Sequence, residues 1–377
     1  MEIQKILIYD KFKCIADKCN FTCCEGWDVF VDTCTYNKWK ENYNLNYLLD
    51  NIKIKEYKDK KEYFINKETH EKCPMLDDNG LCQIVKSHGE EYLSSTCHSF
   101  PRIENNFGYK KEFSLSCACP EVVELLEKEN GKIIMISENH NDCKDNLLEL
   151  NIRKALINIV EYDGISLEKK LIIAFELLLN ILKSKNVKED ILISELKKYE
   201  NVEYIMEFIK AYEEIDFNID ESMEELSCLF LDIIENYKEV SGLEELLGPI
   251  GEFGEAVHIE ILSENWNKYK TLFEEHNKLL ENCIISKILS SCVNEDIEHM
   301  ITAFQIIILE YILVRYAVYL EILMNENEEV NIKDIKDYII VFSRVIDNNI
   351  ESVLEFLREG FGNEILEIGY LCFIGLF

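Results

Sequence analysis

From about residue 144 to the end of the chain, apolar positions recur at a helical spacing almost without a break. The segment 166–185 predicts a helix that begins after an Asp163-Gly164 turn and is capped by Ser166. Gly360 follows the last predicted helix, at the place where a left-handed cap would lie. The helices predicted between these two points lie near residues 189–214, 221–240, 255–285, 295–325 and 333–359.

The first part of the chain has a different pattern, in which short elements are tied by loops. Its predicted elements are a strand at 27–32, a helical segment at 35–49, a tight turn between Cys73 and Cys82, a strand at 110–117 and a helix at 120–129 that starts at Pro120. We therefore predict a mainly α protein, in which a small cysteine-rich α+β metal-binding module over residues 1–143 is followed by an all-helical domain over residues 144–377.

One apolar segment, residues 303–324, is long enough to raise the question of a membrane span. Glu310 and Arg315 interrupt it, so the sequence favours a buried amphipathic helix. Residues 1–12 contain no apolar run of the length that a signal peptide needs. These observations predict a cytoplasmic protein without a membrane span, whose thiols are reduced unless a metal holds them.

Charge narrows the range of partners. The formal net charge of −32 argues against a nucleic-acid partner, because binding to phosphates needs a basic surface. Residues 1–150 contain 20 basic and 27 acidic residues, a net of −7, which leaves −25 for the remainder. The acidic half is explained either by solvated helix faces or by attraction of a lysine-bearing partner.

Cysteine is concentrated at the amino-terminal end, where ten of the 15 cysteines lie within residues 1–119. Adjacent thiols such as Cys23 and Cys24, in the stretch CNFTCCEGWD, rarely form a disulfide with each other, because the small ring strains the peptide. Clustered thiolates are good ligands for zinc or an iron–sulfur cluster. Four later cysteines lie in apolar helical sequence and are predicted to be small core residues: Cys228, Cys283, Cys292 and Cys372.

Radical chemistry on S-adenosylmethionine would need a CxxxCxxC pattern. Starting from Cys19 and Cys23, the third thiol would fall at position 26, which is a glycine. The spacing from Cys14 does not fit either. The sequence therefore predicts that any chemistry on this cofactor is not of the radical type.

Three ordered blocks resemble the flagellin lysine N-methylase family. They are FKCIADKCNFTCCEGWDVFVDTCTY at 12–36, CPMLDDNGLCQIVKSHGEEYLSSTCHSFPR at 73–102 and EFSLSCACPEVVELL at 112–126. A wider group of metal-chelating proteins shares only the paired-cysteine block and the CPxL…C turn, so the LSSTCHSFPR and CPE blocks favour the methylase branch. The resemblance spans roughly the first third of the chain.

The resemblance implies a set of metal ligands. The family pattern falls on Cys14, Cys19, Cys23, Cys24, Cys73, Cys82, Cys97 and Cys119. Eight thiols could complete two four-sulfur sites, or hold one 4Fe-4S cluster with ligands to spare. Cys34 and Cys117 lie outside the pattern and are treated as accessory, and His98 is either a replacement ligand or a hydrogen-bonding neighbour.

The resemblance also implies transfer of a methyl group from S-adenosylmethionine to lysine side chains of flagellin. Such a reaction needs a neutral ε-amine, an in-line donor and a proton acceptor. The candidate catalytic residues, chosen because they lie beside the thiols, are Trp27, Asp28, Glu90, Tyr92, Arg102 and Glu112. Each also has a structural interpretation, as a core aromatic residue, a strand-surface charge or an ion-pair partner.

The sequence does not locate the cofactor. LGPIGEFGEAV at 247–257 has a glycine spacing that superficially resembles a phosphate or adenosine cradle, in which Glu252 or Glu255 could reach a ribose hydroxyl. No strand precedes it, so a loop between two helices is the preferred interpretation. Two further functions stay open, a non-catalytic metal-stapled adaptor and an iron–sulfur sensor or electron-transfer protein.

Overall fold

The computed structural model describes residues 2–25, 27, 29–57, 60–67, 72–129, 135–138, 147–184, 189–216, 218–240, 242–293, 296–347, 350–361 and 365–376. The strands are β1 (Glu2–Ile6), β2 (Phe30–Val31), β3 (Ile52–Tyr57), β4 (Lys60–Ile65), β5 (Arg102–Asn106), β6 (Lys110–Leu115) and β7 (Met135–Glu138). The first helices are α1 (Thr33–Glu41), α2 (Gln83–His88), α3 (Ser95–Ser99) and α4 (Pro120–Lys128). Short 3₁₀ helices cover Tyr9–Lys11, Ala16–Lys18, Tyr43–Asn51, Glu90–Tyr92 and Lys197–Glu200.

The rest of the chain is helical. Its helices are α5 (Leu148–Val160), α6 (Leu167–Lys183), α7 (Glu189–Leu196), α8 (Val202–Glu213), α9 (Ile219–Ile234), α10 (Glu244–Ala256), α11 (Ile259–Glu274), α12 (Asn277–Ser291), α13 (Ile297–Met324), α14 (Ile332–Asp347), α15 (Ile350–Phe361) and α16 (Ile365–Ile374). The prediction of a mainly α protein is confirmed at this level.

Local signals set several helix ends as predicted. The Ser166 hydroxyl accepts a hydrogen bond from the Lys169 amide at the start of α6, and Gly164 before it has a φ of 92°. Pro120 is the first residue of α4. Gly360, however, lies inside α15 and is not a left-handed cap, so that prediction was wrong.

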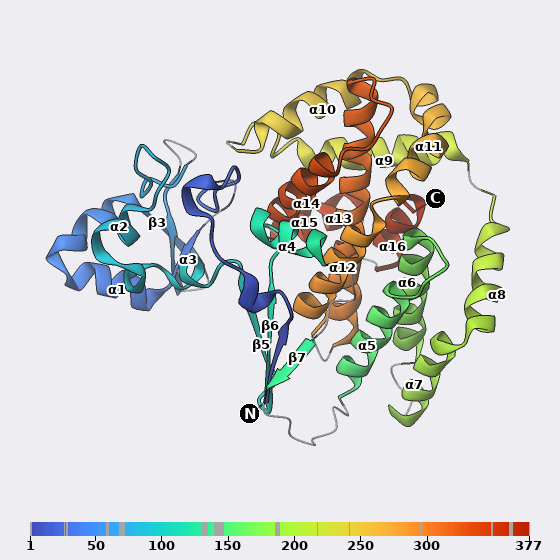
Figure 1. The fold of residues 1–377 in the computed structure, drawn as a ribbon, viewed down its shortest axis with the longest axis horizontal. Coiled ribbons are helices and arrows are strands. Elements are labelled where there is room, and N and C mark those ends of the chain that lie inside the picture. Colours follow the sequence, from blue (N-terminus) through green and yellow to red (C-terminus); the bar gives the residue numbers. More distant parts are fainter. Residues whose placement is uncertain are drawn as a thin grey trace.

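Among the described residues up to Glu138, the strands form two small sheets. In one, the strand order is β5-β6-β1-β7, with β1 parallel to β6 and antiparallel to β7. In the other, the order is β2-β4-β3, and both neighbouring pairs are antiparallel. Figure 1 shows α1, α2, α3 and β3 to one side of the helical body, with the β5-β6-β1-β7 sheet between them.

The main hydrophobic core includes residues from both ends of the chain. It contains Ile6, Ile8 and Leu115 together with side chains of the helices that follow. Helix α12 packs on β6 and α4, and α14 also packs on α4. Because β1 and β6 contribute to the same core as the helices, the four-stranded sheet and the helical body bury their apolar surface jointly.

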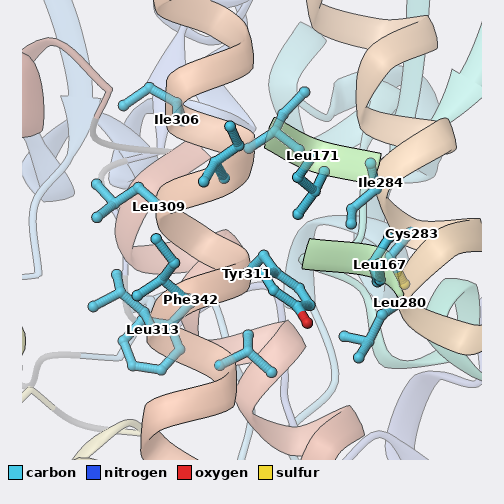
Figure 2. Packing of buried hydrophobic residues seen from close by; sticks show 14 of the residues in the cluster. Leu167, Leu171, Leu280, Cys283, Ile284, Ile306, Leu309, Tyr311, Leu313 and Phe342 are labelled. Atoms are coloured by element: carbon cyan, nitrogen blue, oxygen red, sulfur yellow. The ribbon is translucent and has the colours of Figure 1, made fainter. Parts of the chain in front are cut away.

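Helix α13 lies at the centre of the helical body. Every residue from Phe304 to Leu320 is buried, so the helix is buried as predicted, but it is covered on all sides and is not amphipathic. Figure 2 shows Tyr311 of α13 pointing toward apolar side chains of α6 and α12, such as Leu167 and Leu280, while Leu309 lies on the other side of α13. Among the described helices, none is sufficiently long and apolar to cross a membrane.

A second, smaller core lies within residues 29–97. Trp39, Leu45 and Leu48 are completely buried there, together with Val31 and Met75. The predicted domain boundary between residues 143 and 144 falls within residues 139–146, which lie outside the described part of the chain. The division into two domains at that point therefore stays a prediction.

Two further predictions about single segments are corrected. Cys283, Cys292 and Cys372 are buried as expected, but Cys228 is exposed on α9. Residues 247–257, predicted to form a loop, lie almost entirely within helix α10, which contains Pro249. A β-carbon at Gly251 or Gly254 would come within 3.3 Å of side chains of α9, so these glycines allow the two helices to pack closely.

Candidate thiol site

The turn between Cys73 and Cys82 forms as predicted. Leu76 and Cys82 make an isolated antiparallel bridge, and the Asp77 carboxylate accepts hydrogen bonds from the amides of Asn79 (2.9 Å) and Leu81 (3.0 Å). Gly80 completes the turn with a φ of 74°. Both cysteines thereby contribute to the smaller core, Cys73 as a buried member and Cys82 at its edge.

The paired cysteines lie against this turn. The Cys73 amide donates to the Cys24 carbonyl at 3.0 Å. The next residues, Glu25 and Lys72, pair in an isolated antiparallel β-bridge. The Cys24 sulfur is hydrogen-bonded to the thiols of Cys23 and Cys73. These two hydrogen bonds, of which the one to Cys23 has the larger effect, lower the pKa of Cys24, whereas burial opposes them. The hydrogen bonds to Cys24, together with burial, raise the pKa of Cys23 and Cys73.

Cys97 joins this group from α3. Ser94 caps that helix by accepting a hydrogen bond from the Cys97 amide at 3.2 Å. Burial, with smaller contributions from Cys24 and Cys82, raises the pKa of the Cys97 thiol to about 11. We call Cys23, Cys24, Cys73, Cys82 and Cys97 the first thiol group.

Cys14, Cys19 and Cys119 form what we call the second thiol group. The Cys19 thiol donates to the Phe21 carbonyl at 3.0 Å, and the Cys14 sulfur accepts from the Ala16 amide at 3.4 Å. Cys119 stands just before α4, where burial raises the pKa of its thiol to about 11 and charges on Cys19 and Cys14 act in the same direction. The eight cysteines of the family pattern thus fall into two neighbouring groups.

Arg344 of α14 links the two groups and was not anticipated from the sequence. Its guanidinium donates to the carbonyls of Phe21 (2.6 Å), Thr22 (3.0 Å) and Ala118 (3.1 Å). Phe21 and Thr22 lie between Cys19 and Cys23, and Ala118 immediately precedes Cys119. An arginine in an amphipathic helix more than 200 residues away from either loop gives no local signal of such a role.

Metal ligands need a common centre as well as suitable chemistry. All cysteines in the described part of the chain are free thiols, and Cys143 lies outside it. Across the described residues, no three or more histidine, cysteine, aspartate or glutamate side chains are arranged so that they could hold a metal ion. The donor set has the softness of a zinc or iron–sulfur site, but its geometry is not that of a preformed one.

The two accessory cysteines differ in their surroundings. Cys34 is exposed on α1. Cys117 is buried and hydrogen-bonded to the Cys283 thiol of α12, which lowers the pKa of Cys117 and raises that of Cys283. Cys117 therefore faces the helical body.

Two of the candidate catalytic residues lie beside the first thiol group. The Trp27 indole donates to the Cys23 carbonyl at 2.8 Å, and its ring lies 5.6 Å from that of Phe100. Tyr92 packs at the edge of the smaller core, and the Lys38 ammonium lies over its ring at 4.1 Å. The Tyr92 ring therefore already binds a lysine side chain by a cation–π contact.

For the other candidate catalytic residues in the described part of the chain, the structure shows no hydrogen bond, ion pair or ring contact with the first thiol group. Arg102 is the first residue of β5, and its guanidinium lies over the rings of Phe12 (5.0 Å) and Tyr9 (5.9 Å). Glu112 is buried on β6, where it pairs with Lys110 and Arg153. Glu90 is exposed in the 3₁₀ helix that ends at Tyr92, and Asp28 lies outside the described residues.

Fold and site together define a mainly helical protein with a thiol-rich amino-terminal part. A family profile described as the FliB lysine N-methylase C-terminal domain matches residues 153–374, more than half of the chain. The chain therefore belongs to the FliB lysine N-methylase family. The resemblance seen in the cysteine blocks is confirmed by a match to the helical body, which carries none of those blocks.

Similar proteins include the flagellar biosynthetic protein FliU of Salmonella muenchen, which is 34% identical over 115 residues, 29% of this chain and 68% of that protein. A Lysine-N-methylase of Salmonella typhimurium (strain LT2) is 33% identical over 116 residues, 30% of this chain and 29% of that protein. A Lysine-N-methylase of Salmonella choleraesuis (strain SC-B67) is 33% identical over 115 residues, 29% of this chain and 29% of that protein. No solved structure matches the chain.

Proposed function

We propose that the protein is a protein-lysine N-methyltransferase that takes its methyl group from S-adenosylmethionine and acts on flagellin. The observation that carries the proposal is membership of the FliB lysine N-methylase family, based on residues 153–374. The name of the FliU relative supports a flagellar substrate, and those of the other two support lysine methylation. Because the matches span only 29% of each Lysine-N-methylase, the activity is a proposal for this chain.

The proposed reaction is a polar displacement. The lone pair of a neutral lysine ε-amine forms a bond to the methyl carbon while the carbon–sulfur bond breaks, which gives S-adenosylhomocysteine, methyl-lysine and a released proton. The electrons balance without an oxidant or reductant, so turnover needs no electron donor. This agrees with the glycine at position 26, which rules out the CxxxCxxC spacing from Cys19.

The aromatic surface beside the first thiol group supports the placement of the target lysine. Tyr92 already accommodates the ammonium of Lys38 over its ring, and Trp27 lies next to Cys23. Desolvation against aromatic rings disfavours the charged ammonium and thereby favours the neutral amine that the reaction needs. Asp28 follows Trp27 directly and is the proposed proton acceptor.

The eight family cysteines are the proposed ligands of zinc or a 4Fe-4S cluster. When bound, the metal would tie the loops of the two thiol groups into one rigid unit and would not take part in electron transfer. In the described residues no ligand geometry is preformed, so metal binding would draw the thiols together. The protein chain supplies the aromatic surface and the hydrogen bonds that hold Cys24 and Cys97 in place.

Purified full-length protein, flagellin and S-adenosylmethionine carrying a labelled methyl group, incubated without reductant, test the proposal. We expect label on flagellin lysines and a rate that rises with pH, because the reference pKa of the amine is about 10.4. Isothermal titration with S-adenosylmethionine separates an enzyme from an adaptor. A folded, metal-loaded protein that leaves flagellin unlabelled would refute the proposal, and label that appears only with an electron donor would refute the polar mechanism.

A further inference from the structure

Arg344 reaches from the helical body into both thiol groups. It lies on α14, and only 2% of it is exposed. Its Nε donates to the Ala118 carbonyl, while Nη1 and Nη2 donate to the carbonyls of Thr22 and Phe21. One planar guanidinium therefore binds the backbone of two cysteine-bearing loops that are about a hundred residues apart in the sequence.

The polar surroundings of Arg344 are backbone carbonyls, cysteine sulfurs and one carboxylate. The groups that interact with its charge are first Cys23, Cys19 and Cys119, and then Glu25. Its ring contact is with Phe21, 5.6 Å from the guanidinium. A buried cation is costly unless it is hydrogen-bonded, and here three carbonyl dipoles accept from the guanidinium while the Glu25 carboxylate acts on its charge.

We infer that Arg344 is a positioning residue of the thiol site: its hydrogen bonds to the carbonyls of Phe21, Thr22 and Ala118 set the spacing of the nearby cysteines, Cys19, Cys23 and Cys119, and attach them to α14. The inference rests on the proposed thiol centre, but not on methyl transfer. It also explains how the helical body that defines the family takes part in a site whose cysteines lie in another part of the chain.

Arginine is required for this role because of its shape. The guanidinium presents donors in a fixed plane, so it can hold three carbonyls from two directions at once. Lysine keeps the charge but has a single nitrogen on a flexible stem. Arg344→Lys therefore separates the contribution of charge from that of positioning, and Arg344→Met removes both.

Arg315→Met is the matched control. Arg315 is also buried in the helical body, on α13, where it contacts the Gly375 carbonyl, Glu168 and the Trp266 ring. None of these contacts belongs to a thiol loop. Arg315→Met therefore controls for the general effect of removing a buried arginine from the helical body.

The experiment measures amide hydrogen exchange by mass spectrometry, together with metal per chain, in the full-length variants. We expect exchange in residues 16–25 and 116–120 to become about tenfold faster in both Arg344 variants, while α9 stays protected. We also expect metal content to fall below half of the wild-type value in both. Arg315→Met should leave these two loops and the metal content unchanged, whatever it does to global stability.

Two results would overturn the inference. One is loop exchange that rises no more in the Arg344 variants than in Arg315→Met. The other is wild-type exchange and metal content in Arg344→Lys, which would show that charge alone is needed. Because neither readout uses methyl transfer, an inactive wild-type protein would refute the proposed function and leave this test intact.

Discussion

Glu112 of β6 and Arg153 of α5 form a buried ion pair, with a carboxylate oxygen 2.7 Å from Nη2 of the arginine. Lys110 lies 2.9 Å from the same carboxylate, and Arg153 also donates to the Leu289 carbonyl of α12. The pair therefore connects the four-stranded sheet of the first third to two helices of the body. It gives Glu112 a structural role that its position beside the cysteines did not reveal.

The first prediction is that Glu112→Gln destabilises the protein by about 3–5 kcal/mol, because it leaves two buried cations without a carboxylate. Glu104→Gln on the adjacent β5 is the control, since Glu104 pairs with Lys111 at the surface and should cost under about 1 kcal/mol. Urea denaturation measures both. A Glu112→Gln protein that is as stable as the wild type but does not methylate flagellin would instead support a catalytic role.

The second prediction concerns Lys287 of α12, whose ammonium lies 2.6 Å from Glu310 and 2.5 Å from Asp347. Burial, followed by the Asp347 charge, raises the pKa of Glu310 well above its usual value, although Lys287 opposes this. A carboxyl with a raised folded-state pKa contributes stability that is complete below its unfolded pKa, about 4.3, and is lost as the pH rises towards the folded value.

Glu310→Gln should accordingly be neutral or stabilising near neutral pH, and should make unfolding less dependent on pH. Lys287→Met should destabilise by about 1.5–3 kcal/mol, because the Asp347 carboxylate loses its charged hydrogen-bond donor. Urea denaturation at about pH 5 and about pH 8 measures both effects. Equal destabilisation by the two variants at the higher pH would mean that Glu310 is ionised and needed as a partner of Lys287.

The third prediction tests the independence of the smaller core. Trp39 is completely buried there, and its indole donates to the Tyr92 carbonyl at 2.9 Å. Trp39→Ala should cost about 3–5 kcal/mol and open residues 29–97 to limited proteolysis while the helical body stays intact. Trp266→Ala, at a buried tryptophan of α11, should open the helical body. Identical fragment patterns from the two variants would contradict separate cores.

The fourth prediction concerns metal. Cys24→Ser should lose most of the bound metal and loosen the amino-terminal part, because metal binding energy at such a site is largely folding energy. Cys34→Ser, at an exposed thiol outside the family pattern, should keep both metal and melting temperature. Elemental analysis and thermal melting measure these effects, and full metal content in Cys24→Ser would exclude it as a ligand. A brown wild-type protein indicates an iron–sulfur cluster, and a colourless one indicates zinc.

Features that depend on residues near each other in the chain could be predicted from the sequence. The Ser166 cap, the Pro120 helix start and the turn at Asp77 were predicted correctly, because each is decided by hydrogen bonds or dihedral limits within four residues. The cysteine blocks also indicated the family, since thiol spacing along loops is a local property. These local signals predict the fold class and the family resemblance, but not the arrangement of the site.

Tertiary packing decided the rest. Residues 247–257 have the glycines and proline of a loop, yet they are helical because Gly251 and Gly254 allow α10 to pack closely on its neighbours. The parallel pairing of β1 with β6 and the contact of Arg344 with Phe21 each join residues more than a hundred positions apart. Such contacts depend on which buried surfaces meet in the folded chain, and no local pattern encodes that choice.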